Sequence, residues 1–213
     1  MARIDTVEEL EALYPSPAAR TLTKIRDHLD SGLAALIESS PFVLLATADA
    51  DGRCDVSPRG GPPGFVKVLD ANHVALPDLN GNHLLDSLHN LLTNPHAALL
   101  VMVPGQDETL RVEGTAHITT DDDVLDLFVD ELRRPAVAVV IEVVSAYTHC
   151  AKAFRRGQVW SRESWPQHDR SPFLAARHAQ VLGDGLTDQS VDDYIATNVC
   201  KIDDDLAADA PVG

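Results

Sequence analysis

The chain has 213 residues, a formal net charge of −16 and 45% hydrophobic residues. This length is enough for one domain with a sizeable core, and the acidic balance argues against nucleic-acid binding, which needs a basic face. No apolar run approaches the roughly 20 residues of a membrane-spanning helix, and the acidic N-terminal stretch is unlike a secretory signal. We therefore expect a cytoplasmic protein that binds neither nucleic acid nor a membrane.

The cysteines and histidines do not form a recognisable ligand pattern. The three cysteines are far apart and include no CxxC motif, which favours reduced thiols. The nine histidines lack the spacing of a usual zinc ligand set. We expect neither disulfides nor a metal site.

The first part of the chain predicts two helices and a hairpin. Helices are expected over 5–14 and 18–39, the second from leucines and isoleucines that recur near the helical period. The stretch PFVLLATADADGRCDVS, 41–57, predicts two strands joined by a turn at Asp51-Gly52.

Short strands separated by brief helices follow. We expect strands over 65–69, 73–76, 96–103, 109–119 and 136–144. We expect helices over 83–92, 121–132 and 145–156. Because the regular strand-helix-strand rhythm of a parallel sheet is missing, this order favours a mainly β fold, a small antiparallel barrel of six or seven strands with flanking helices.

We expect one domain over 1–213. It comprises a helical N-terminal extension over about 1–40, a barrel core over about 41–160 and a helical or loop tail over 161–213.

The stretch SPRGGPPG places Arg59 between prolines and glycines just before a predicted strand. A surface turn is the ordinary interpretation of such a segment. Since cations are scarce in this acidic chain, the alternative is that Arg59 is held for a ligand.

The stretch PDLNGNHLLDSLHN, 77–90, follows a strand and leads into a helix. Asn82, the glycine backbone at Gly81 and the hydroxyl of Ser87 offer hydrogen-bond donors to a phosphate. The same residues also suit a turn followed by a helix cap.

The order of five segments resembles a known family. SPRGGPPGFVKVLD, LPDLNGNHLLDSL, NPHAALL, PGQDETLRVEG and AYTHCAKAFRRGQVW together resemble the pyridoxamine 5′-phosphate oxidase-related FMN-binding split β-barrels, in the branch distinct from the true oxidase. The resemblance covers roughly residues 35–160. The sequence departs from the family pattern at Gly61, where an acidic residue is frequent, and at Leu84, where a basic one is.

The resemblance implies a split β-barrel homodimer with FMN between the subunits. Residues 65–67 would lie along the flavin, Asn82 and Ser87 at the phosphate, and Arg59 or Lys67 near N1, where positive charge favours the reduced ring. The residues expected to bind the cofactor are Arg59, Phe65, Val66, Lys67, Pro77, Asp78, Asn82, Ser87, Thr109 and Lys152.

The function expected from this resemblance is an FMN-dependent oxidoreductase. It would transfer a hydride or electrons to a small substrate, with NAD(P)H as a possible donor, and no residue stands out as an acid–base catalyst. Two alternatives stay open: the same barrel using a deazaflavin or haem, and a non-catalytic flavin-binding module.

Overall fold

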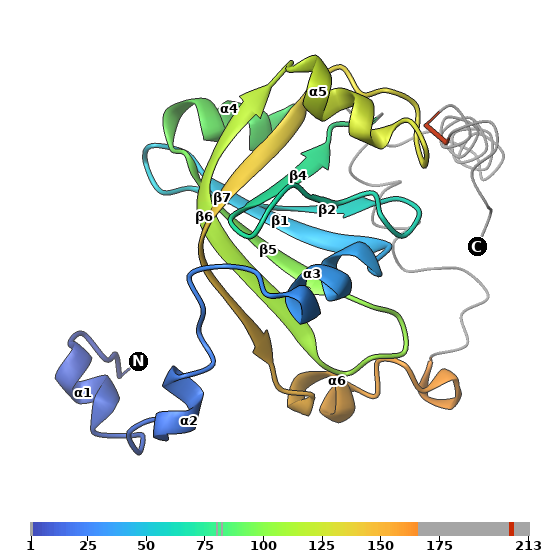
Figure 1. Cartoon of the computed structure of the whole chain (residues 1–213). Coiled ribbons are helices and arrows are strands. Elements are labelled where there is room, and N and C mark those ends of the chain that lie inside the picture. Colours follow the sequence, from blue (N-terminus) through green and yellow to red (C-terminus); the bar gives the residue numbers. More distant parts are fainter. Residues whose placement is uncertain (1, 80, 82, 166–204, 207–213) are drawn as a thin grey trace, which may run out of the picture.

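The computed structural model describes residues 2–79, 81, 83–165 and 205–206. Its centre is one seven-stranded antiparallel sheet in the order β2-β1-β5-β6-β7-β4-β3, curved into a barrel (Figure 1). The strands are β1 Phe42–Ala48, β2 Cys54–Gly60, β3 Lys67–Val68, β4 His73–Pro77, β5 His96–Met102, β6 Thr109–Thr119 and β7 Ala138–His149. The expected mainly β split barrel with flanking helices is confirmed.

Short helices surround the barrel. They are α1 Val7–Glu11, α2 Ala19–Leu22, α3 Ser31–Glu38, α4 Asp86–Thr93, α5 Asp122–Leu125 and α6 Lys152–Gly157, with 3₁₀ helices η1 Asp126–Phe128 and η2 Arg162–Ser164. Figure 1 shows α1 and α2 standing away from the sheet, and α1 buries none of its residues. None of the helices in the described part of the chain has the length and apolarity to cross a membrane.

The core lies inside the barrel and follows from strand alternation. In β1 every second residue is buried, as in β5, because successive side chains point to opposite faces of a strand. Phe65, Val66 and the α4 residues Leu88 and Leu91 join the buried strand residues in one cluster. A second cluster, around Phe128, covers the other face of β4 and β7.

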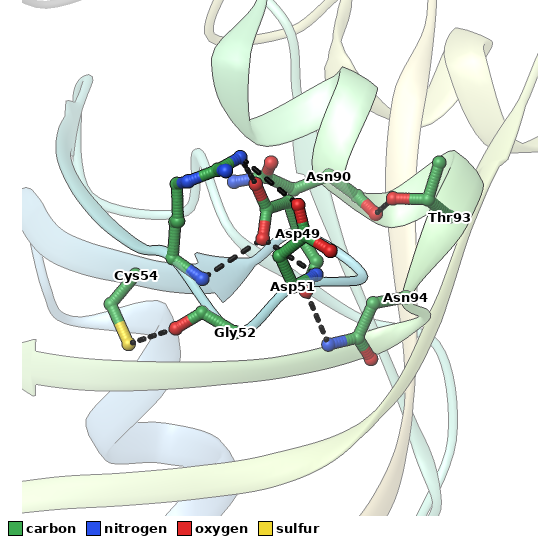
Figure 2. Close-up of polar contacts among 8 residues, drawn as sticks. Asp49, Asp51, Gly52, Cys54, Asn90, Thr93 and Asn94 are labelled. Atoms are coloured by element: carbon green, nitrogen blue, oxygen red, sulfur yellow. Dashed lines mark hydrogen bonds and ion pairs between the residues drawn. The ribbon is translucent and has the colours of Figure 1, made fainter.

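The hairpin of β1 and β2 turns as predicted, and α4 is tied to it. Gly52 has φ +80° in the turn, a conformation that favours glycine. Asp49 Oδ1 accepts the backbone N–H groups of Asp51 and Arg53, both at 2.9 Å (Figure 2). Asn94 Nδ2, just after α4, donates to the Asp49 carbonyl at 3.4 Å. The Asn94 bond ties the end of α4 to the β1–β2 turn.

The continuous helix predicted over 18–39 is wrong. Helices α2 and α3 are separated by an extended segment in which Arg26 forms a two-way backbone bridge with Ala146 of β7. Helix α3 begins at Ser31 and is capped by Asp30, whose Oδ1 accepts the N–H groups of Gly32 and Leu33 at 2.9 Å each. Pairing with the sheet overrides the helical period here.

The helix predicted over 145–156 is wrong in its first half. Strand β7 runs to His149 because β6 is 11 residues long and pairs with β7 from end to end, Thr109 opposite His149. Only Lys152–Gly157 is helical. Nearly all of the predicted tail over 161–213 lies outside the described residues.

The boundaries of β2 and β3 also differ from expectation. Strand β2 continues to Gly60, so Pro58 and Arg59 are strand residues rather than turn residues. Pro58 is tolerated because β2 is an edge strand and needs no further N–H donor there. Strand β3 is only Lys67–Val68, and Phe65 and Val66 are buried just before it.

Candidate functional site

A pocket of about 450 Å³ opens between β2, the end of β4 and the start of α4. Its size falls within the range of about 300–1,000 Å³ typical of small-ligand sites. The apolar part of its lining comes from Phe65, Pro77 and several leucines that precede or begin α4. The polar part comes mainly from one face of β2.

The alternation of β2 places three polar side chains on this face. Asp55, Ser57 and Arg59 are half-buried, while the residues between them are exposed. They pair with Thr47, Leu45 and Val43, whose side chains are all buried. The inner face of β2 therefore carries a carboxylate, a hydroxyl and a guanidinium in a row.

These side chains form a hydrogen-bonded chain that reaches α4. Arg59 Nε donates to Ser57 Oγ at 3.2 Å, Ser57 Oγ lies 3.1 Å from Ser87 Oγ, and Ser87 Oγ donates to Asp55 Oδ2 at 2.7 Å. Ser87 is 2% exposed. Because the only hydroxyl hydrogen of Ser87 goes to Asp55, Ser57 is the donor between the two serines.

Arg59 connects this chain to the end of β4. Its Nη1 donates to Asp78 Oδ1 at 3.1 Å, and the Arg59 side chain is 23% exposed. A guanidinium carries five N–H donors, and these contacts use two of them. The other three have no partner among the described residues.

The entrance to α4 has an unusual backbone. His83 and Leu85 both have φ +58°, a left-handed conformation that is uncommon for residues other than glycine. Leu85 occupies the N-cap position and its side chain makes no capping bond. Such strain persists where surrounding structure imposes it, frequently at binding sites, and both residues line the pocket.

Five of the predicted cofactor-binding residues line this pocket. They are Arg59, Phe65, Pro77, Asp78 and Ser87. Asn82 lies outside the described residues. Val66, Lys67, Thr109 and Lys152 are described and do not line the pocket.

Lys67 lies on β3 and is ion-paired. Its Nζ donates to Glu131 Oε2 at 2.6 Å, and its side chain is 19% exposed. The Glu131 carboxylate offsets much of the positive charge of Lys67. Val66, its neighbour, is fully buried in the core.

Thr109 and Lys152 belong to the opposite end of β7. Pro77 pairs with Ala138 at the start of β7, whereas Thr109 pairs with His149 at its end. At about 3.3 Å per residue, these points are roughly 36 Å apart along the strand. Because of this distance, the predicted contacts fall into two separate groups. Thr109 is buried and Lys152 is exposed.

Basic side chains surround His149 at this end. Partial burial lowers the pKa of His149, the nearby Lys24 and Arg111 lower it further, and Glu113 acts in the opposite direction. Lys24 is held in place by the Thr148 carbonyl at 2.7 Å. The folded protein therefore disfavours the protonated imidazole.

Stability is expected to fall as the pH drops below the unfolded pKa of histidine, about 6.5. Since the folded-state pKa of His149 is lowered, the unfolded chain binds more protons in this range, and the lost stability is present again above about pH 6.5. His149→Gln should reduce the difference in melting temperature between pH 7.5 and pH 5.5. His89→Gln, which removes an exposed imidazole of α4, serves as the control. An unchanged pH dependence in His149→Gln would contradict the prediction.

Sequence reasoning missed Asp55 and Ser57. Their signal was present as the i, i+2, i+4 spacing with Arg59, but interpreting SPRGG as a turn ended the strand too early. Among the described residues, no cluster of His, Cys, Asp or Glu could hold a metal ion.

Comparison with known proteins supplies the family. A sequence profile described as pyridoxamine 5′-phosphate oxidase matches residues 29–153, more than half of the chain. A search of curated proteins returns no match.

Solved structures with a similar course of the chain include three bacterial proteins. A putative pyridoxamine 5′-phosphate oxidase from Lactobacillus delbrueckii is 24% identical, covers 57% of this chain and 95% of its own, and gives a TM-score of 0.45. HupZ from Group A Streptococcus is 16% identical over 56% of this chain and 93% of its own, with a TM-score of 0.47. An FMN-binding protein from Syntrophomonas wolfei is 11% identical over 55% and 82%, with a TM-score of 0.43.

The profile match spans α3, all seven strands and the pocket-lining start of α4. It agrees with the resemblance found in the order of the sequence motifs. The chain belongs to the pyridoxamine 5′-phosphate oxidase family.

Proposed function

We propose that the chain is an FMN-dependent oxidoreductase and that the pocket between β2, β4 and α4 holds the flavin. The observation that carries the proposal is Arg59, the only Lys or Arg among the described residues that line this pocket. It lies in a chain of net charge −16. A guanidinium with three donors that find no partner in the described part of the chain is suited to an electron-rich ring or an anionic group.

The residues present fit a flavin. Phe65, Pro77 and the leucines offer apolar surface to a ring system, while Arg59 and Asp78 offer a donor and an acceptor at its edge. A bound flavin supplies hydride and electron transfer. The chain's part is to orient the ring, exclude water from it and favour negative charge on it through Arg59.

A homodimer would bring the two groups of predicted contacts together. Thr109 and Lys152 lie at the far end of β7 from Pro77, so one subunit does not offer both groups to one ligand. We propose that the partner subunit supplies the second group, with Val66, Lys67 and Asn82 as further candidates from the first. The substrate would be a small molecule, with NADH or NADPH as donor.

The visible spectrum of protein purified without added cofactor tests the proposed function. FMN is expected to give flavin absorbance bands and to be released on unfolding, and NADH or NADPH to bleach them. A haem spectrum would reject the proposal. So would the absence of flavin bands after incubation of the protein with FMN. Bound FMN that neither donor reduces would favour a non-catalytic module.

Lys67→Met is expected to lower the midpoint potential of bound FMN only modestly. About 1.4 kcal/mol shifts a two-electron couple by ~30 mV, and we expect a shift no larger than this because Glu131 already offsets the charge of Lys67. Glu131→Gln removes the offset and should raise the potential. Redox titration of both variants measures the effect. If neither variant shifts the potential, Lys67 does not face the flavin.

A further inference from the structure

Helix α1 belongs to an N-terminal arm, residues 2–22, whose apolar side chains are uncovered. Among the described side chains of residues 2–28, none is buried. The large apolar side chains around α1 are 47% to 69% exposed: Ile4, Val7, Leu10, Leu13 and Tyr14. Their spacing of three or four residues follows the helical period, which places Val7 and Leu10 in one apolar stripe on α1.

Helix α1 is nevertheless a well-specified helix. Thr6 Oγ1 accepts the N–H of Glu9 at 3.1 Å, and Glu9 Oε2 accepts the N–H of Thr6 at 3.3 Å, the reciprocal pair of a capping box. Most of the stability of a short helix comes from packing of its apolar face. Figure 1 shows α1 apart from both the sheet and α6, so no surface in the described part of the chain covers the stripe.

The apolar stripe of α1 has an acidic edge. Glu8 and Glu11 follow Val7 and Leu10 directly, so they lie beside the stripe on the helix surface. Both carboxylates are exposed and have no partner among the described residues. The surface that covers α1 is therefore expected to combine exposed apolar side chains with cations.

The α6–η2 surface, formed by Arg156, Val159, Arg162 and Trp165, has this composition. Val159 is 39% exposed and Trp165 is 51% exposed. Trp165 Nε1 donates to the Val159 carbonyl at 2.8 Å, which holds the two residues side by side. Arg156 and Arg162 are exposed and have no partner among the described residues. This surface is complementary to α1 in charge and similar to it in exposed apolar area.

We propose that the N-terminal arm crosses to a second copy of this chain, where α1 docks on the α6–η2 surface. The apolar stripe of α1 covers Val159 and Trp165, and its two carboxylates meet the guanidinium groups of Arg156 and Arg162. In a two-fold dimer each copy gives one arm and receives one, so the contact is made twice. The proposal rests on the homodimer proposed above and does not depend on the flavin.

The two tryptophans of the chain, Trp160 and Trp165, report directly on this contact. Docking of α1 buries Trp165, so tryptophan fluorescence of the wild-type dimer should be protected from quenching by acrylamide. Leu10→Ser should remove this protection and weaken the dimer by about tenfold or more, since one apolar side chain is lost from each arm. Leu92→Ser, which removes a 73% exposed leucine from α4, is the matched control and should change neither measurement.

Reversal of the charges distinguishes docking between copies from docking within one chain. One variant carries Glu8→Arg and Glu11→Arg, and the other carries Arg156→Glu and Arg162→Glu. Each variant alone brings like charges together and should form a dimer weaker by about tenfold or more in sedimentation velocity. An equimolar mixture should restore both the dimer and the protection of the tryptophans, because both contacts of a mixed dimer join opposite charges.

A mixture that associates no better than either variant alone would overturn the proposal, and so would Leu10→Ser behaving like Leu92→Ser. In both cases a wild-type dimer would leave the proposed homodimer standing. A monomeric wild type would reject the homodimer and the arm contact together, while the flavin spectrum is measured separately. If Leu10→Ser does not fold, the mixture of charge variants decides.

Discussion

Replacing Arg59 by methionine is expected to weaken FMN binding by roughly 10- to 150-fold. This range corresponds to about 1.5–3 kcal/mol, the contribution of a hydrogen bond to a charged group. Methionine keeps much of the length and apolar bulk of the stem but offers no donor. The fold should survive, because Arg59 lies on an edge strand and its side chain is partly exposed.

The control for this prediction is Arg53→Met. Arg53 belongs to the same hairpin, is paired with Asp49 and Asp51, and does not line the pocket. Titration of both variants by flavin fluorescence, with thermal unfolding to check the fold, makes the comparison. If FMN binding weakens equally in both variants, the effect comes from the overall charge of the protein. If binding is unchanged in Arg59→Met, the flavin binds elsewhere.

Replacing Gly114 by alanine is expected to destabilise the protein by at least about 3 kcal/mol, in the upper range of single substitutions. A Cβ atom at this position would lie 1.9 Å from the Glu142 carbonyl oxygen and 2.8 Å from its carbon. Those atoms are backbone of the neighbouring strand, so relief requires β6 and β7 to move apart. The pairing register already shifts between Glu113 and Gly114, and this close approach accompanies that irregularity.

For a chain of this size, such a loss lowers the melting temperature by roughly 6–12 °C. Gly157→Ala in α6 is the comparison, because its Cβ would meet the Val159 side chain at an ordinary 3.4 Å. Calorimetry or thermal circular dichroism measures both. A Gly114→Ala variant as stable as Gly157→Ala would mean that the strands can separate there at little cost.

Local sequence signals identified the elements that are regular along their own length. The alternation in TLRVEGTAHIT predicts β6 over 109–119, which matches the strand residue for residue, because period two is intrinsic to a half-buried strand. The turn at Asp51-Gly52 was also predicted from the sequence. In contrast, the region around Arg26 has a helical apolar period, and only its distant partner Ala146 makes it extended.

In the candidate site, too, some residues were identified from the local sequence and others depend on contacts with distant elements. Arg59 and Ser87 were found from their chemical type, since a lone cation and a hydroxyl at a helix start stand out in an acidic chain. Asp55 was not, because its importance depends on a 2.7 Å bond to a residue on another element. That bond also ties Ser87 of α4 to β2, a contact that no local pattern reveals.

Because β2 lies at the edge of the sheet, its polar residues at the pocket are separate from the residues that form the core. β2 has one neighbouring strand and no fully buried residue, while the core is built from the strands beyond it, from α4 and from the segment before β3. Substitutions at positions 55, 57 and 59 therefore exchange polar groups at the pocket without opening cavities in the core. Such a wall can diversify over evolution while the barrel behind it stays the same, so relatives with one fold can acquire different ligands through a single strand.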